Sequence, residues 1–403
     1  MLLVIAAALI AAGGTVDAQP SVTTVHVGSG PAAVVVVPSA HRVYVANELD
    51  QTVSAVDTTT ETVIATIPVG ASPAALAYDQ STGSLYVANS GSNTLSVIDG
   101  ATNRVIATIP VGRQPSYLDI NPTTDRMYVS NFQGDSISVV DGRARTVIAT
   151  VPVGARPSSL AINPTTNRVY VANTNGQSVS VIDGATNRVV ATVPTGVNPQ
   201  DVVVDVALDR IDVVNNGPGT VSVIDGPTSL PIEIDAVGSQ PVSAVVDPSD
   251  HRLYVANFTS NTITVLGGGN AAVPVSIPVG TGPADVLLNP ATHHLFVACE
   301  LGNTLSAIDT RSASVVASVP VGVRPTALGL DPTTNRVYVI NSGSNTVSIV
   351  NDDASLTEAV APARPPVSPS SPLPRGGGDP LVAIVLAGAS LVVLGVSARA
   401  AFG

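Results

Sequence analysis

Lysine and tryptophan are absent from this 403-residue chain, cysteine occurs once, and charged residues make up only 11% of it. All 17 basic residues are therefore arginines, and the formal net charge is −12 without an acidic block. A chain of this charge offers no basic groove for phosphates, so we expect no nucleic-acid partner. The single Cys299 excludes an intramolecular disulfide, and we expect packing and strand hydrogen bonds to hold the core.

The most regular feature of the chain is a pentad, Val-Tyr-Val-Ala-Asn or a near copy, that occurs eight times with a spacing of 42 residues. Its second position holds Tyr44, Tyr86, Tyr128, Tyr170, Asp212, Tyr254, Phe296 and Tyr338. Each unit also contains four short runs rich in Val, Ile, Thr and Tyr, separated by Asn-Pro, Asp-Gly or Val-Gly. Such runs between turn residues predict four β-strands per unit.

Four strands in about 42 residues are the size of one propeller blade, so the repeat predicts an all-β fold, a single eight-bladed β-propeller. The two ends of the series predict how the ring closes. Residues Ser21 to His26 match the fourth strand of the unit, whereas the last copy stops after its third strand, at Val347 to Val350. We therefore expect the N-terminal strand to complete the last four-stranded antiparallel blade, within a domain of residues 20–351.

These motifs resemble those of a known family, the YVTN-repeat β-propellers, which include YncE-like and surface-layer-like proteins. The resemblance rests on sequences such as Leu85 to Asn89, followed by Asn93 to Gly100, and it extends over nearly all of the globular part. It implies a propeller on a prokaryotic surface or in a periplasm. Members often have seven blades, so the number eight comes from the repeat count. The family implies no single activity, because propellers carry many unrelated functions.

Both ends of the chain carry patterns typical of targeting segments. An apolar run from Leu2 to Ala12, followed by Val16-Asp17-Ala18, predicts a signal peptide over residues 1–18, although a basic start is missing. Residues 352–380 are rich in Pro, Ser and Gly and are interpreted as a linker. The uncharged run from Leu381 to Ala398 would be about 27 Å long as a helix, close to the ~30 Å of a bilayer core, and predicts a transmembrane anchor.

A short tail, residues 399–403, follows this run, and its Arg399 would lie inside the cell. The order of linker, Leu373 to Gly377, apolar span and basic tail also resembles a sortase sorting signal, but Gly376 stands where that signal has a threonine. We favour a plain membrane anchor over covalent attachment to the wall. Either interpretation predicts a propeller outside the cytoplasm, held at the cell membrane or surface.

The repeat also predicts where a binding site would lie. In a propeller with this closure, the loops that contain Val-Gly-x-x-Pro and the loops between the second and third strands open on one face, around the mouth of the central channel. The residue before the proline of each inner strand varies while its neighbours repeat: Gly30, Ser72, Gln114, Arg156, Asn198, Gln240, Gly282 and Arg324. Variation within a repeat marks where a function can be added to a common scaffold.

The predicted ligand site at this mouth comprises Arg113, Gln114, Tyr117, Arg156, Asn198, Asp201, Gln240, Asp285, Glu300 and Arg324. Two arginines opposite two aspartates could bind a small anionic or sugar-like ligand, because guanidinium groups match carboxylates and hydroxyls. In the alternative interpretation, the arginines and aspartates pair with each other and close the channel.

We predict no cofactor and no metal. The pyrroloquinoline quinone site of related propellers would use a tryptophan, which is absent, and there is no Cys-x-x-Cys-His for covalent haem. Of five histidines only His293 and His294 are adjacent, in a turn where other repeats have Asn-Arg, and adjacent strand residues point to opposite faces. A lactonase-like hydrolase, suggested by related propellers, would need a base and a metal or cationic cluster, for which Asp201, Asp285 and Glu300 are the candidates.

Other repeated polar residues are interpreted as structural. Aspartates end the third strand at Asp57, Asp99, Asp141, Asp183, Asp225 and Asp309, and we expect them to cap hairpin turns rather than bind calcium. The same capping role is assigned to Asn47, Asn89, Asn131, Asn173, Asn215, Asn257 and Asn341, which end the second strand. Cys299 replaces one of these asparagines and is interpreted as a small, partly buried thiol. Asp212 replaces a blade-packing tyrosine, and its burial is costly unless the carboxylate is paired or hydrated; Arg210 lies on the same strand face.

We therefore expect an exported, membrane-tethered propeller that acts as a recognition or structural module of the cell envelope. Its predicted partners are an extracellular ligand, an envelope protein or a glycan. A surface-layer role would predict self-association through the apolar rims of the blades. We do not expect an enzyme, and the alternative is the lactonase-like hydrolase.

Overall fold

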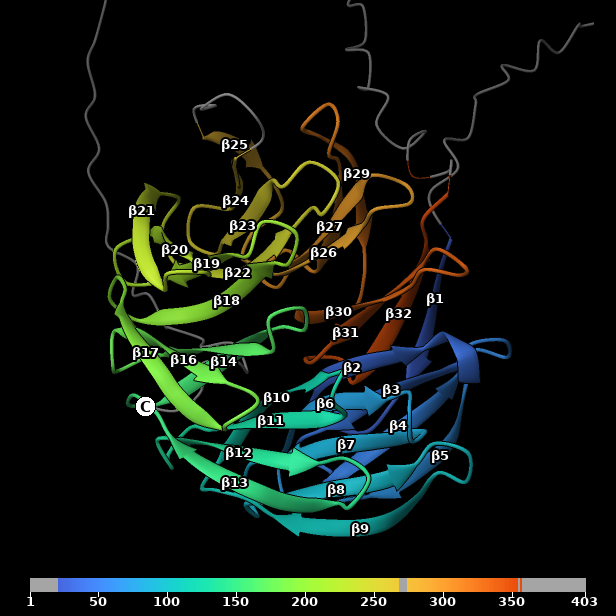
Figure 1. Cartoon of the computed structure of the whole chain (residues 1–403). Helices are drawn as coiled ribbons and strands as arrows, with labels where there is room; N and C mark the ends of the chain where they lie inside the picture. Colours follow the sequence, from blue (N-terminus) through green and yellow to red (C-terminus); the bar gives the residue numbers. More distant parts are fainter. Residues whose placement is uncertain (1–20, 268–273, 354–355, 357–403) are drawn as a thin grey trace, which may run out of the picture.

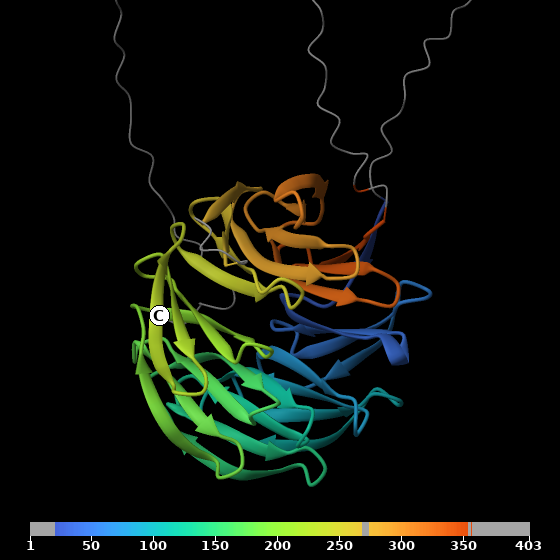
Figure 2. The same ribbon diagram turned by 45° about the horizontal axis from the view of Figure 1, so that its top comes forward.

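The computed structural model describes residues 21–267, 274–353 and 356. These residues form eight four-stranded antiparallel sheets, arranged as the blades of one ring (Figure 1, Figure 2). The prediction of an all-β, eight-bladed propeller is thus confirmed. The signal peptide, the membrane span, the tail and all of the linker except residues 352, 353 and 356 lie outside the described residues, and they stay predictions. Within the described part of the chain, no helix is long and apolar enough to span a bilayer.

Each of the first seven blades follows the chain from an inner strand at the channel to an outer strand at the rim. Blade 1 comprises β2 (Pro31–Val37), β3 (Arg42–Asn47), β4 (Thr52–Asp57) and β5 (Thr62–Pro68), with a 3₁₀ turn at Pro38–Ala40. Blade 2 comprises β6 (Pro73–Asp79), β7 (Ser84–Asn89), β8 (Thr94–Asp99) and β9 (Arg104–Pro110). Blade 3 comprises β10 (Pro115–Asn121), β11 (Arg126–Asn131), β12 (Ser136–Asp141) and β13 (Thr146–Pro152). Blade 4 comprises β14 (Pro157–Asn163), β15 (Arg168–Asn173), β16 (Ser178–Asp183) and β17 (Arg188–Pro194).

The second half of the ring repeats this order. Blade 5 comprises β18 (Pro199–Asp205), β19 (Arg210–Asn215), β20 (Thr220–Asp225) and β21 (Leu230–Ala236). Blade 6 comprises β22 (Pro241–Val246), β23 (Leu253–Asn257), β24 (Thr262–Leu266) and β25 (Val275–Pro278). Blade 7 comprises β26 (Pro283–Asn289), β27 (His294–Cys299), β28 (Thr304–Asp309) and β29 (Ser314–Pro320).

The eighth blade closes the ring with strands from both ends of the domain. It contains β30 (Pro325–Asp331), β31 (Arg336–Asn341), β32 (Thr346–Asn351) and, at the rim, β1 (Val22–His26). Strand β1 is antiparallel to β32, from Val22 opposite Val350 to His26 opposite Thr346. The predicted closure by the N-terminal strand is confirmed.

Neighbouring blades are joined by the aromatic residue of the pentad, which is fully buried at every aromatic copy. Tyr44 donates a hydrogen bond to the carbonyl oxygen of Gly100 over 3.2 Å, and Tyr86 donates to that of Gly142 over 2.7 Å. Both acceptors lie in the Asp-Gly turn of the next blade. Burial raises the pKa of both phenols to about 12, so they remain donors at any physiological pH.

The repeated aspartates cap their turns as predicted. In blade 4, Asp183 Oδ1 accepts the backbone N–H groups of Ala185 and Thr186, each over 2.8 Å. Equivalent bonds are made by Asp57, Asp99, Asp141, Asp225 and Asp309. These carboxylates are therefore turn residues of the scaffold.

The prediction for the repeated asparagines was wrong. Asn173 Nδ2 donates to the hydroxyls of Ser178 and Ser180 over 3.1 and 2.9 Å, and no described group donates to its Oδ1. The side chain therefore ties the second strand to the third instead of capping a turn. A Cβ on Gly154, in the Val-Gly loop, would lie 2.6 Å from Asn173 Cγ. This close approach explains why glycine recurs in that loop.

Two departures from the repeat are accommodated inside the blades. Cys299, which replaces an asparagine, is fully buried, with Sγ 3.5 Å from Ser306 Oγ, and burial raises the pKa of its thiol. It is more buried than predicted, but its structural interpretation agrees with this environment. Asp212 is also buried, and its Oδ2 lies 3.1 Å from Nε of Arg210, the neighbour on the same strand face.

The adjacent histidines lie in different environments. His293 remains in the turn, whereas His294 begins β27 and is buried, with Nδ1 2.6 Å from Asp352 Oδ1. In blade 6 the equivalent Arg252 donates to the backbone oxygen of Thr310, also 58 residues further along the chain. His294 therefore replaces a contact between blades. No group of three or more His, Cys, Asp or Glu side chains within the described ranges could hold a metal ion.

Candidate functional site

The inner strands surround a central channel, and the third residue of each inner strand contributes to one ring around it. This ring contains Ala33, Ala75, Tyr117, Ser159, Asp201, Ser243, Asp285 and Ala327. Blades 8, 1 and 2 contribute alanine, whereas blades 4 to 7 contribute alternating serine and aspartate. The channel is therefore polar on one side only.

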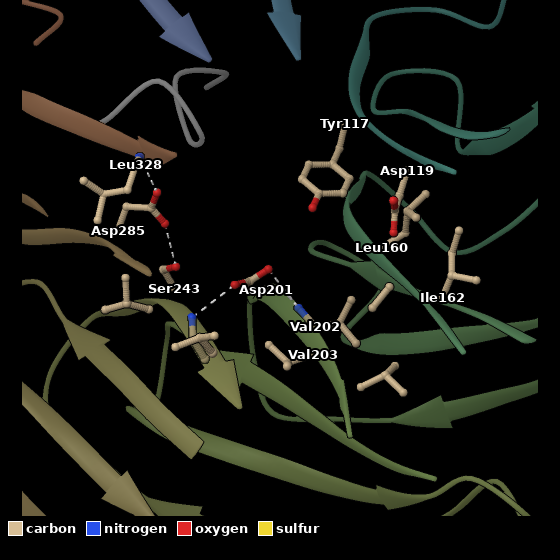
Figure 3. Close-up of a pocket in the computed structure, with 15 residues that line it drawn as sticks. Tyr117, Asp119, Leu160, Ile162, Asp201, Val202, Val203, Ser243, Asp285 and Leu328 are labelled. Carbon is tan, nitrogen blue, oxygen red and sulfur yellow. Dashed lines mark hydrogen bonds between the residues drawn. The ribbon is translucent and has the colours of Figure 1, made fainter. Parts of the chain in front are cut away.

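Hydrogen bonds between blades hold the two aspartates of the ring (Figure 3). Ser159 Oγ donates to Asp201 Oδ1 over 2.9 Å, and Ser243 Oγ donates to Asp285 Oδ1 over 3.0 Å. In both cases the second carboxylate oxygen accepts a backbone N–H group from the following blade, over 3.2 and 3.0 Å. Each carboxylate thus bridges three blades through neutral donors, which compensate part of its lost hydration.

Two cavities lie along the channel. The mouth, on the face of the Val-Gly loops, has a cavity of about 530 Å³, and a deeper cavity of about 360 Å³ follows it. Tyr117, Asp285 and Leu328 line both of them. The mouth is within the size range of small-molecule sites.

The mouth has two chemically different walls. The wall from blades 8, 1 and 2 is mainly apolar and is built largely by Ala32 to Val34, Ala74 to Leu76, Ala327 and Leu328, with Glu48 and Thr326 as its polar residues. The opposite wall, from blades 4 to 6, carries Arg156, Thr174, Asn198, Gln200, Asn216 and Gln240. Phe132 from blade 3 and Phe258 from blade 6 also line the cavity and stand at the two ends of the polar wall.

The amides of the polar wall are linked in one direction. Gln200 Nε2 donates to Asn198 Oδ1 over 3.3 Å, Asn198 Nδ2 donates to Asn216 Oδ1 over 3.4 Å, and Asn216 Nδ2 donates to the carbonyl oxygen of Pro241 over 3.1 Å. This arrangement orients three amides. Each NH₂ group carries two hydrogens, so donors remain for a ligand.

The structure distributes the predicted site residues over three environments. Tyr117, Arg156, Asn198, Gln240 and Asp285 line the mouth, and Asp201 lines the deeper cavity. The other four, Arg113, Gln114, Glu300 and Arg324, line neither cavity. Of these, Arg113 is exposed and Gln114 is buried. Whether any of them contacts a ligand stays a prediction.

The predicted arginines and aspartates make contacts with other partners than each other, as Arg324, Arg156 and Asp201 show. Arg324 donates twice to Glu300 Oε1, over 3.0 and 2.7 Å, so its charge is neutralised beside the channel. The Arg156 guanidinium lies 5.5 Å from the centre of the Phe132 ring. Asp201 receives serine and backbone donors. Arg324 and Asp201 therefore form neither an anion clamp nor an ion pair that closes the channel.

Of the residues that begin the loop between the second and third strands, sequence reasoning named only Glu300. The first residue of this loop directly follows the repeated asparagine and is Glu48, Ser90, Phe132, Thr174, Asn216, Phe258, Glu300 or Ser342. Five of the eight line the mouth. The signal was available, because this position also varies while its neighbours repeat.

Asp119 is the second residue that sequence reasoning missed. It lies on β10 two positions after Tyr117 and lines the deeper cavity, together with apolar residues such as Ala161 and Val203 (Figure 3). Its Oδ1 accepts the N–H of Ile120 over 2.7 Å, and burial raises the pKa of its carboxyl to about 6. The cause is desolvation, since no cation among the described residues lowers it.

Comparison with known families agrees with this architecture. The model of the YNCE-like β-propeller matches residues 3–202. The chain belongs to the YVTN-repeat β-propeller family. The model of the cytochrome D1 haem domain matches residues 121–332, and no curated protein sequence matches the chain.

A solved structure extends the likeness to most of the ring. The hydrazine synthase of Kuenenia stuttgartiensis is similar to this propeller with a TM-score of 0.58 and 20% sequence identity. The match covers 81% of this chain and 97% of that chain. At this identity the similarity shows the fold alone.

The haem suggested by the cytochrome D1 match does not fit the channel residues. Haem iron is held by His, Cys, Met or Tyr side chains. Within the described residues of the matched segment, none of the residues that line the two cavities is of these types. Cys299 is buried under Gly280, and His294 is bound to Asp352. Tyr117 lines the cavities but precedes the matched segment.

Proposed function

We propose that this propeller is an exported, surface-tethered binding protein whose ligand docks at the channel mouth. The observation that carries the proposal is the division of the mouth cavity into an apolar wall and an amide-rich wall, with phenylalanines at the ends of the polar one. A sugar matches this division, because its ring carbons present an apolar face and its hydroxyls pair with amides that both donate and accept. The predicted signal peptide and membrane span support the location.

The charges near the mouth favour a neutral, hydroxyl-rich ligand over an anion. Of the two predicted arginines, Arg324 is paired with Glu300 and lines neither cavity, whereas Arg156 lines the mouth with its guanidinium 5.5 Å from the centre of the Phe132 ring. Among the described residues, the deeper cavity is lined by the carboxylates of Asp119, Asp201 and Asp285 and by no arginine. An anionic group that entered the channel would meet their negative potential.

A lactonase-like hydrolase is the second candidate, and Asp119 is the residue that favours it. The candidates predicted from the sequence are occupied, because Asp201 and Asp285 each bridge blades and Glu300 pairs with Arg324. Asp119, with its raised pKa, is better suited to proton transfer near neutral pH. In this reading Asp119 would be the general base.

The test is a binding screen of the full chain against neutral glycans, followed by titration of Asn198→Ala/Gln200→Ala. Loss of two oriented amides should weaken binding about tenfold or more, since each hydrogen bond contributes roughly 1 kcal/mol. Gln133→Ala is the matched control, because Gln133 is an exposed amide on a neighbouring loop outside both cavities.

Two results would decide against the sugar site. One is the absence of binding by any glycan in the screen, and the other is equal binding by the double variant and the Gln133→Ala control. A parallel assay with simple lactones tests the hydrolase. Turnover by the wild type that Asp119→Asn abolishes, with glycan binding absent, would establish the second candidate instead.

A further inference from the structure

The outer strand of blade 5, β21, differs from the outer strands of blades 1 to 4 and 7 in the side chains that it turns toward solvent. In blades 1 to 4 and 7, the residues at the first, third and fifth positions are polar, apolar and polar, as in Thr62, Ile64 and Thr66. The corresponding residues of β21 are Leu230, Ile232 and Ile234, which are 60%, 62% and 66% exposed. Three large apolar side chains therefore stand together in solvent on one strand.

The other face of β21 differs as well. The sixth position of the outer strand is a buried Ile or Val in the compared blades, such as Val193, which is 2% exposed. In β21 this position is Asp235, and Glu233 stands two residues before it. Glu233 is exposed and Asp235 is partly buried. The strand thus carries apolar side chains at the outward first and fifth positions, where the compared strands are polar, and an acidic one at the inward sixth position, where they are apolar.

The strand is also an open edge. Within the described residues, β21 pairs with β20 alone and is the last strand of its sheet, at the rim of the ring (Figure 1). The outward backbone groups of an edge strand can pair with an added strand, and exposed apolar side chains on such an edge favour that pairing.

We propose that β21 is a docking edge for an extended segment of another protein, in which apolar residues alternate with arginine or lysine. In an added antiparallel strand, residues directly opposite each other share a face of the sheet. The apolar residues of the partner would cover Ile232 and Ile234, while its basic residues would pair with Glu233 and Asp235. The charge of the edge selects this partner.

A second copy of this chain fits the same edge less well. Antiparallel pairing of two β21 strands would set Glu233 and Asp235 near the same carboxylates of the partner, and like charges opposite each other are destabilising. The formal net charge of −12 on each chain adds to this repulsion.

The experiment measures binding of a fluorescent peptide of alternating valine and lysine, long enough to pair with all of β21, to the full chain. Leu230→Thr/Ile234→Thr gives β21 the polar, apolar, polar outward pattern of its neighbours, and it should weaken binding at least about tenfold. Val190→Thr, at the exposed position of β17 that corresponds to Ile232, is the control and should bind as the wild type does. Circular dichroism verifies that the variants, changed only at exposed positions, are folded.

Control peptides separate specific docking from charge attraction. A peptide of alternating serine and lysine should bind much more weakly, and one of alternating valine and glutamate should not bind. Equal binding of the valine–lysine and serine–lysine peptides, or no effect of the β21 variant, would overturn the proposal. A concentration-dependent dimer that the same variant abolishes would assign the edge to a second copy instead.

Discussion

Asp212 is the residue at which burial and charge compete most directly. It occupies a position that holds a fully buried tyrosine in six repeats, and it is itself buried. Arg210 lies 3.1 Å away and favours the ionised form, but desolvation is the larger effect and raises the pKa of Asp212 to about 6. The ion pair therefore offsets only part of the cost of burial.

A pH-dependent stability follows for Asp212. Between about 3.9, the pKa in an unfolded chain, and about 6, the folded protein retains a proton that the unfolded chain releases. The free energy of unfolding should thus fall as the pH rises through this window. Asp212→Asn removes this titrating group. The free energy of unfolding of the variant minus that of the wild type should therefore be on the order of 2 kcal/mol more positive at pH 7 than at pH 4. Urea unfolding at both pH values measures this, and a wild-type-to-variant difference independent of pH would contradict it.

Among the repeated polar residues, sequence reasoning predicted that the aspartates cap turns but did not predict that the asparagines bond to the facing strand. The aspartate bonds are local, two or three residues along the chain, so the turn pattern alone specifies them. The Asn173 bonds reach residues on the facing strand, and the side chain packs under Gly154. Such contacts depend on strand register and on the approach of a loop, which no local pattern contains.

The strands themselves could be predicted almost completely, because every unit repeats the same runs and turns. The orientation of β21 could not, since Leu-Pro-Ile-Glu-Ile-Asp alternates as well as any other strand. Alternation specifies two faces but not which of them points inward. The register with β20, in which Asp235 lies opposite Val221, decides that question.

Closure of the ring depends on one short strand, β1, and on the packing of Val25. This side chain is buried against residues of β31 and β32 such as Tyr338 and Ile349. Val25→Asp should lower the free energy of unfolding by about 3 kcal/mol or more, because an uncompensated charge would be buried there. Thr24→Asp, exposed on the same strand, is the control and should cost less than about 1 kcal/mol. Denaturant unfolding compares them, and equal losses would show that β1 is not needed for closure.

At the scale of the whole molecule, the sequence located the mouth but not its chemistry. Of the eight varying positions 42 residues apart, Arg156, Asn198 and Gln240 line the mouth. Which side chains meet there depends on the bonds between blades, such as Ser159 to Asp201 and Arg324 to Glu300. Residues 42 or 24 positions apart become neighbours only through the curvature of the ring.

The interfaces between neighbouring blades, here called seams, are not equivalent, and the seam between blades 5 and 6 carries aspartates at two positions that are apolar or aromatic in other blades. There Asp212 replaces a tyrosine and Asp235 replaces a buried Ile or Val, and burial and Glu233 raise the pKa of Asp235. The seam between blades 3 and 4 retains Tyr128 and Val151 in an apolar cluster. Local opening costs less where fewer apolar contacts are lost, so stability should vary around the ring.

Hydrogen exchange followed by mass spectrometry tests this difference. Amides of β20 and β21 should exchange faster than those of β12 and β13, by about tenfold for each 1.4 kcal/mol difference in opening free energy. Asp235→Val restores the side chain of the other blades and should slow exchange in β20 and β21 while leaving β12 and β13 unchanged. Uniform exchange rates, or a slowing that extends equally to all blades, would mean that the ring opens as one cooperative unit and that the polar seam has no separate stability.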